Sequence, residues 1–189
     1  MEIIMEDKVL FGYKTEPIYI SIPNSKQLIQ RGLKYFLGEN AKWIPEYDEI
    51  SEWLRDNNGK GLLLIGDSGR GKTFIADKIL TPIIKNSFYS SNFDVVFVMG
   101  YSMLEDYERG SGRMYIVDDV GVEREQSVYG ERINAFNKII YESELFKRLL
   151  IITTNLTIKE LEEKYGERTI DRLRSLTKPV VFRGKSFRV

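Results

Sequence analysis

The chain has 189 residues, of which 42% are hydrophobic and 12% aromatic, so one domain with a buried core is expected. Basic and acidic residues number 28 each, and the net charge of zero gives no sign of a polyanionic partner. The absence of cysteine and histidine excludes disulfides, thiol catalysis, Cys/His zinc sites and imidazole bases, which leaves carboxylates, lysine, arginine and Mg²⁺ as the available chemistry.

No apolar stretch approaches the roughly 20 residues that a membrane-spanning helix needs. Residues 1–7 lack the basic segment that precedes an apolar one in a secretion signal. We therefore expect a cytoplasmic protein without a membrane partner.

The first 42 residues carry mixed signals. We expect an extended segment at residues 9–22 and a helix at residues 26–37, whose apolar residues recur unevenly. From Pro45 the pattern is sharper, because proline suits the first turn of a helix, and residues 57–59 (Asn-Asn-Gly) would end that helix.

A phosphate-binding loop is the most informative feature of the chain. Residues 61–65 are typical of a buried strand, and the next eight fit the pattern G-x-x-x-x-G-K-[ST]: Gly66, Asp67, Ser68, Gly69, Arg70, Gly71, Lys72 and Thr73. In such a loop the glycines let backbone N–H groups converge on phosphate oxygens, Lys72 reaches the outer phosphates, and the Thr73 hydroxyl ligates Mg²⁺. We predict that these residues bind ATP.

Four more apolar runs follow, at residues 93–99, 114–117, 149–153 and 179–182, with helical patterns between them. A helix is expected at about residues 131–146, and Thr157 and Glu160 form a capping box for the next helix. Short strands that alternate with helices indicate βαβ units. The predicted fold is α/β, with a parallel five-stranded sheet sandwiched by helices.

Two of these strands end in side chains suited to hydrolysis. Asp118 comes 52 residues after Gly66 and is followed by Asp119, so Asp118 would hold hydrated Mg²⁺ beside the loop and Asp119 would orient or deprotonate the attacking water. Asn155 follows the strand at 149–153 and would place the same water from the opposite side. The alternatives are a solvated strand end for the acids and a turn or cap role for Asn155.

Together these motifs resemble those of the AAA+ ATPases of the DnaC/DnaI helicase-loader and IstB transposition-helper group. The resemblance covers residues 43–189 and includes residues 165–173 (Tyr-Gly-Glu-Arg-Thr-Ile-Asp-Arg-Leu) and 186–188 (Ser-Phe-Arg). It implies self-association when ATP is bound, with Arg172 as an arginine finger that reaches a neighbouring subunit's ATP and Arg168 as a second candidate. It also implies that Arg188 is a second sensor. The alternative for these arginines is a solvated helix face.

The chain also departs from the family pattern. Only 17 residues follow Arg172, so we expect no C-terminal helical lid. Residues 1–42 would form a short N-terminal extension before an AAA+ ATPase domain at residues 43–189. Without cysteine or histidine this extension cannot be the zinc-bearing helicase-binding domain of some loaders, which puts helicase loading in doubt.

Evidence for nucleic acid is indirect. From residue 168 onward there are seven basic residues and one acid, an excess that could attract phosphates of ATP or DNA. Residues 100–113 lie where ring-forming AAA+ proteins place channel loops, and there Tyr101 and Tyr107 could stack on bases while Arg109 and Arg113 pair with the backbone. The alternative is an ordinary connection that contains a short helix.

The sequence thus indicates a Mg-ATP-dependent ATP hydrolase of the AAA+ type that acts in DNA replication. Its expected task is to load or remodel a replicative helicase on single-stranded DNA. Three alternatives stay open: an IstB-like transposition helper, a P-loop small-molecule kinase with a second acceptor pocket, and a nucleotide-controlled binding module with negligible turnover.

Overall fold

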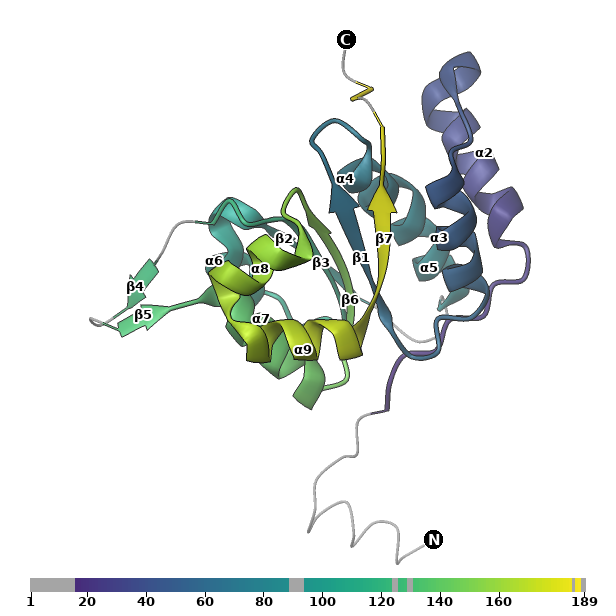
Figure 1. The fold of residues 1–189 in the computed structure, drawn as a ribbon. Coiled ribbons are helices and arrows are strands. Elements are labelled where there is room, and N and C mark those ends of the chain that lie inside the picture. The colour runs from purple at the N-terminus through teal and green to yellow at the C-terminus, as the bar shows by residue number, and fades with distance from the viewer. Residues whose placement is uncertain (1–15, 89–93, 124–125, 129–130, 185, 188–189) are drawn as a thin grey trace, which may run out of the picture.

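The computed structural model describes residues 16–88, 94–123, 126–128, 131–184 and 186–187. Five strands form one sheet in the order β2-β3-β6-β1-β7, and every neighbouring pair is parallel (Figure 1). Their bounds are Gly61–Gly66 for β1, Val95–Met99 for β2, Met114–Val120 for β3, Leu149–Thr154 for β6 and Thr177–Phe182 for β7. The predicted α/β fold with a parallel five-stranded sheet is confirmed.

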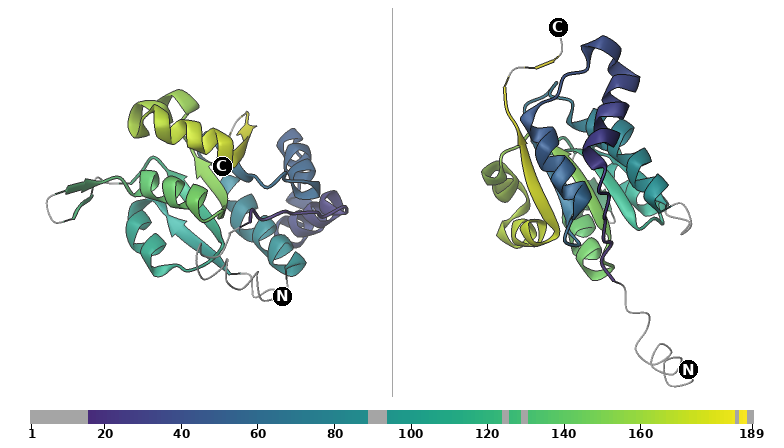
Figure 2. Two further views of the ribbon diagram at one scale, coloured as in Figure 1. Left: turned by 90° about the horizontal axis from the view of Figure 1, so that it is seen from below. Right: turned by 90° about the vertical axis from the view of Figure 1, so that its right-hand side faces the viewer.

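Helices cover both faces of this sheet (Figures 1 and 2). One face packs against α2 (Ser25–Leu37), α3 (Pro45–Arg55), the π-helix η2 (Ile75–Leu80) and α5 (Thr81–Ser87). The other face packs against α6 (Met103–Arg109), α7 (Ala135–Leu145), α8 (Ile158–Tyr165) and α9 (Glu167–Leu176). The capping box predicted at Thr157 and Glu160 begins α8, with both of its reciprocal hydrogen bonds formed.

Two hydrophobic cores lie on the two faces, and the central strands serve both. In β1, Leu62 and Leu64 belong to the first core, whereas Leu63 and Ile65 belong to the second. Successive side chains of a strand point to opposite faces, so a strand covered on both faces must be apolar at every position. The continuous apolar run at residues 61–65 therefore reflects a place inside the sheet.

Residues 16–37 share the first core with the helix that follows. Asn57, just after α3, accepts a hydrogen bond from the Ile20 N–H at 2.8 Å and donates one to the Ile18 carbonyl at 2.9 Å. The residues expected to be extended therefore lie along α3, although residues 16–22 form neither helix nor strand and residues 9–15 lie outside the described part. The domain division at residue 42 stays a prediction.

The start of the helix expected at residues 131–146 is wrong. Residues Glu131–Ile133 form β5, which pairs with β4 (Gln126–Val128) in a small antiparallel sheet, and α7 begins only at Ala135. The side chain of Asn134 accepts a hydrogen bond from the Asn137 N–H at 3.1 Å and so caps the helix at this point. The apolar spacing continues on the N-terminal side of Asn134, so it does not show where the helix begins.

No helix in the described part of the chain is long and apolar enough to span a membrane. Past β7, residues 183–184 and 186–187 contain no helix.

Candidate nucleotide-binding site

The phosphate-loop residues connect β1 to α4 (Lys72–Phe74), which continues into η2 and α5. The loop needs glycine at Gly66, where φ is 147° and an added Cβ would lie 2.3 Å from the Phe182 carbonyl oxygen of the adjacent strand. Gly71 has φ of 80° and is the residue before the first helical turn. The helical stretch thus begins at the loop, with its positive end directed there.

Lys72 joins the loop to the end of β6. Its ammonium group donates hydrogen bonds to the carbonyls of Gly66 at 2.6 Å and Asp67 at 2.9 Å, and to Oδ1 of Asn155 at 2.8 Å. The residue is only 6% exposed. A buried ammonium with three oxygen acceptors carries its positive charge at a defined place beside the loop.

The acidic pair at the end of β3 lies where the register with β6 shifts, between Val117 and Val120, and its two carboxylates have different partners. Asp118 is 6% exposed, and its Oδ1 accepts hydrogen bonds from the Thr73 hydroxyl at 2.8 Å and the Thr153 hydroxyl at 2.7 Å. Asp119 has a φ of 56°, and its Oδ1 accepts a hydrogen bond from Nδ2 of Asn155 at 2.9 Å. One acid therefore faces the loop threonine, and the other faces Asn155.

Thr153 is a member of this site to which the sequence analysis gave no role. Its hydroxyl donates to Asp118 and accepts the Asp119 backbone N–H at 2.8 Å, so it links the two acids. It is 1% exposed. The sequence feature that pointed to Thr153 was its position at the end of the apolar strand that precedes Asn155.

The strand order explains why these residues meet. Since β6 lies between β1 and β3, the residues that leave β6 stand between the phosphate loop and the acidic pair. Asn155 consequently bonds to Lys72 on one side and to Asp119 on the other. Carboxyl ends of parallel strands are where α/β proteins bind ligands.

Thr73 and Asp118 fit a magnesium ion bound together with phosphates. Their side-chain oxygens are hard ligands of the kind that Mg²⁺ prefers, and they lie 2.8 Å apart. Within the described residues no group of three or more acidic side chains could hold a metal ion by itself. The remaining ligands of Mg²⁺ would be phosphate and water oxygens, as is usual for this ion.

Arg172 lies away from the phosphate loop of its own chain. It is on α9, four residues before the end of that helix, and α9 leads into the amino end of β7 while the loop leaves the carboxyl end of β1. Six residues of β7, at about 3.3 Å each, put roughly 20 Å between these two edges of the sheet. Figure 1 shows α9 and the loop between β1 and α4 at opposite ends of these strands.

Arg172 lines a groove between α7 and α9 that has a volume of about 600 Å³. Its Nε donates to Oε2 of Glu144 at 2.9 Å, and its guanidinium lies 5.4 Å from the ring centre of Tyr141. Arg168 lines the same groove and is exposed, and its side chain has no hydrogen bond or ion pair to another described residue. Arg188 lies outside the described residues.

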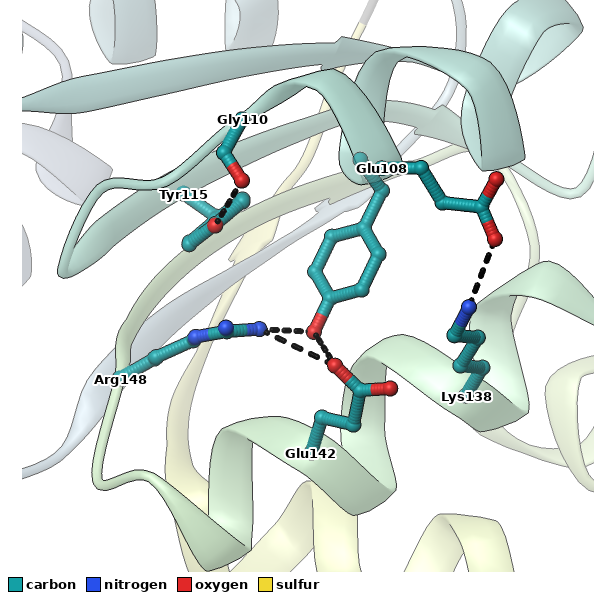
Figure 3. Close-up of polar contacts among 7 residues, drawn as sticks. Glu108, Gly110, Tyr115, Lys138, Glu142 and Arg148 are labelled. Atoms are coloured by element: carbon teal, nitrogen blue, oxygen red, sulfur yellow. Dashed lines mark hydrogen bonds and ion pairs between the residues drawn. The ribbon is translucent and has the colours of Figure 1, made fainter.

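The base-stacking role predicted for Tyr107 is wrong. Tyr107 is on α6 and only 4% exposed, and its hydroxyl donates to Oε2 of Glu142 at 2.8 Å and accepts from Arg148. Figure 3 shows Glu142 and Arg148 pointing toward one another in this cluster. Burial, followed by the hydrogen bond to Glu142, raises the pKa of Tyr107 far above its ordinary value. The ring belongs to the second core and is closed to a nucleic-acid base.

Tyr101 is the exposed aromatic residue of the same segment, with 69% of its surface accessible. Arg109 pairs with Glu105 at 3.6 Å, and Arg113 donates to the Glu16 carbonyl at 2.6 Å. A short 3₁₀ helix, η4 (Gly100–Ser102), and α6 occupy most of this segment, as the alternative interpretation expected.

The strand order, the loop after β1 and the acids at the end of β3 define the class of protein as an α/β P-loop protein of the AAA+ type. No protein-family model matches the chain. A crystal structure of a candidate primosome component from Streptococcus pyogenes serotype M3 is similar, with a TM-score of 0.56 and 19% identity over 89% of this chain and 93% of that chain. AMPPCP-bound DnaA from Aquifex aeolicus has a TM-score of 0.50 and 17% identity over 75% of this chain and 49% of that chain.

The DnaC helicase loader has a TM-score of 0.48 and 16% identity over 92% of this chain and 96% of that chain. Among curated proteins, NACHT, LRR and PYD domains-containing protein 1 homolog from Danio rerio is 41% identical over 49 residues. These residues are 26% of this chain, and the chain spans 4% of that protein. The likenesses to the primosome component and to DnaA show that the chain has an α/β P-loop fold.

Proposed function

We propose that this chain is a Mg²⁺-dependent AAA+ ATPase of the DnaC/DnaI kind that acts in DNA replication. The observation that carries the ATPase proposal is the hydrogen-bonded set of Lys72, Asn155 and Asp119 beside the phosphate loop. A cation, an amide and a carboxylate from three separate segments meet there, which supports a site built to hold phosphate and activate water.

Each residue of the site would have one task. Lys72 neutralises phosphate charge, and the backbone N–H groups of residues 66–73 hold phosphate oxygens. Asp119 accepts a hydrogen bond from the attacking water on the oxygen that Asn155 leaves available, while Asn155 keeps the carboxylate oriented. Mg²⁺ bound by Thr73 and Asp118 would supply positive charge at the phosphates.

Arg172 would act on the nucleotide of a neighbouring subunit. Its side chain is 39% exposed and lies on the order of 20 Å from the loop of its own chain, so it is available to a second copy. An arginine finger supplied in this way stabilises charge that develops in the transition state. This proposal includes self-association of the ATP-bound chain, and the rate of ATP hydrolysis would then depend on the assembly of subunits.

Within replication we propose that the chain loads or remodels a replicative helicase on single-stranded DNA. The fold likeness to a candidate primosome component and to DnaA supports this setting. Tyr101 is exposed enough to stack on a base, and the excess of basic residues from residue 168 onward could contact phosphates.

Two other activities compete with this proposal. An IstB-like transposition helper would share the same nucleotide site and differ in its partner. A small-molecule kinase would need an acceptor pocket beside the loop, and the groove of about 600 Å³ is lined by α7, α9 and the residues just before α9, with no residue from the loop. That groove therefore does not support the small-molecule kinase hypothesis.

The partner can be tested with the Asp119→Asn variant as bait in the presence of Mg-ATP, since this variant should bind ATP without consuming it. Lys72→Ala, which should not bind ATP, is the matched control bait. Recovery of a replicative helicase by the first bait only is the expected result. Recovery of a transposase would favour the transposition helper, and ATP-dependent recovery of neither would contradict the helicase proposal.

A further inference from the structure

Arg70 is a residue of the phosphate loop whose side chain points into the protein. It is 6% exposed, and its guanidinium lies 3.9 Å from the carboxylate of Glu46, which is equally buried on α3. In a phosphate loop this position contributes to phosphate binding through its backbone. A buried arginine side chain that is paired with a residue of α3 therefore needs another explanation.

Arg70 and Glu46 both hold the backbone of Arg183, the first residue after β7. Nη2 of Arg70 donates to the Arg183 carbonyl, and the Arg183 N–H donates to Oε1 of Glu46 at 2.7 Å. Arg70 thus bonds to the backbone carbonyl of Arg183, and Glu46 bonds to the backbone N–H of the same residue. The other oxygen of Glu46, Oε2, is buried without a hydrogen-bond partner among the described residues, so the carboxylate depends on these contacts.

Four residues farther on, Phe187 contacts the loop itself. Its N–H donates to the Gly69 carbonyl at 2.9 Å, and its ring lies 4.3 Å from the guanidinium carbon of Arg70. The segment that leaves β7 is consequently fastened at both of its described ends to the phosphate loop. We refer to residues 183, 184, 186 and 187 as the C-terminal segment.

The hydrogen bond from Phe187 orients a peptide group of the loop. A trans peptide unit is planar, so the Gly69 carbonyl and the Arg70 N–H point in opposite directions. While the carbonyl is held toward the C-terminal segment, the Arg70 N–H must point away from that segment. Amide donors that point inward from such a loop are the groups that bind phosphate oxygens.

We propose that Arg70 and Glu46 are positioning residues that dock the C-terminal segment on the outer side of the phosphate loop and so orient the Arg70 N–H for nucleotide. Nucleotide affinity and docking of the segment are then coupled. This inference rests on the proposed nucleotide binding and adds a control element to that site. Because coupling is reciprocal, nucleotide must strengthen docking by the factor by which docking strengthens nucleotide binding.

The test compares the affinity of four chains for a fluorescent ADP derivative (mant-ADP) in the presence of Mg²⁺. Phe187→Pro removes the donated N–H, and Arg70→Met removes the guanidinium while keeping an unbranched side chain. Arg183→Ala is the matched control, because both contacts of Arg183 with the ion pair use its backbone. Loss of one hydrogen bond should weaken mant-ADP binding by about 2- to 10-fold in Phe187→Pro. Arg70→Met should lose at least as much, and Arg183→Ala should bind like the original chain.

Hydrogen exchange followed by mass spectrometry supplies a second readout that a purely structural role would not move. In the original chain mant-ADP should slow amide exchange in a peptide spanning residues 183–187, and in Arg70→Met it should not. Thermal unfolding checks each variant, and if Arg70→Met does not fold, Phe187→Pro still decides because Phe187 is 49% exposed at the end of the described chain.

Unchanged affinity in both variants, or exchange that is the same with and without mant-ADP in the original chain, would overturn the inference while nucleotide binding stands. If the original chain fails to bind mant-ADP at all, the proposed nucleotide site is wrong and the inference fails with it.

Discussion

Replacing Asp119 with asparagine should slow turnover severely while the chain still folds and binds Mg-ATP. Asparagine retains an oxygen that can accept the hydrogen bond from Nδ2 of Asn155. Asparagine also tolerates the left-handed backbone at this position, where φ is 56°. The change therefore removes the negative charge and leaves the local geometry in place.

The expected rise in the activation free energy of hydrolysis exceeds the expected loss of folding stability by several kcal/mol. A hydrogen bond to a charged acceptor contributes about 1.5–3 kcal/mol and one to a neutral acceptor about 0.5–1.5 kcal/mol, so the variant should lose about 1 kcal/mol of stability. Asn155 is exposed, which keeps this loss at the low end. Removing a general base should slow turnover by about 10²- to 10⁴-fold, equivalent to about 3–5 kcal/mol in the activation free energy.

Three measurements test this reasoning: thermal unfolding, affinity for Mg-ATP and the rate of phosphate release. Asp119→Ala is a matched control, because it also removes the charge but forces a residue with a Cβ and no polar group into the left-handed region, at a further cost of about 1–2 kcal/mol. Lys72→Ala should lose ATP affinity outright. Equal loss of ATP affinity in Asp119→Asn and Lys72→Ala would refute the separate roles.

Three further predictions concern assembly, DNA and pH. Arg172→Ala should keep monomer affinity for ATP and lose about 10³- to 10⁵-fold in turnover at concentrations where subunits associate, and mixing it with Lys72→Ala should restore some activity; mixtures as inactive as either variant alone would contradict a finger acting in trans. Single-stranded DNA should bind more tightly with a non-hydrolysable ATP analogue than with ADP, and Tyr101→Ala should lose about 1–3 kcal/mol in fluorescence anisotropy titrations across a salt series; affinity indifferent to nucleotide would count against DNA assembly. Because burial raises the pKa of Tyr107, the folded state keeps the phenolic proton that the unfolded state releases above about pH 10, so stability should fall as pH rises past 10. That fall should be shallower in Tyr107→Phe, and identical slopes in urea titrations would argue against the buried position.

Local patterns in the sequence predicted the features that depend on near neighbours. The phosphate loop needs only a strand, glycines at fixed offsets and Lys72, all within about a dozen residues, so its pattern is readable without the fold. The capping box of Thr157 and Glu160 joins residues three apart, and the strands show themselves as apolar runs because both faces of the sheet are covered. The start of α7 was missed because the cap at Asn134 is a single side-chain hydrogen bond inside a longer apolar pattern.

The two tyrosines of the segment after β2 show the limit of such patterns. Tyr101 and Tyr107 have the same chemistry and lie six residues apart, yet one is 69% exposed and the other 4%. What separates them is the packing of α6 on α7, which encloses Tyr107 with Glu142 and Arg148. No local rule carries that information.

The sequence by itself therefore determined the fold class, and it predicted the phosphate loop and the acidic pair at the end of β3, since strand periodicity and short motifs express local geometry. The tertiary structure alone decided which distant residues meet. Asn155 bonds to Lys72, 83 residues away, because β6 lies between β1 and β3 in the sheet. Arg70 reaches the backbone of Arg183, 113 residues away, because β7 pairs with β1 at the sheet edge, and only that pairing turns the arginine of the loop into a contact for the C-terminal segment.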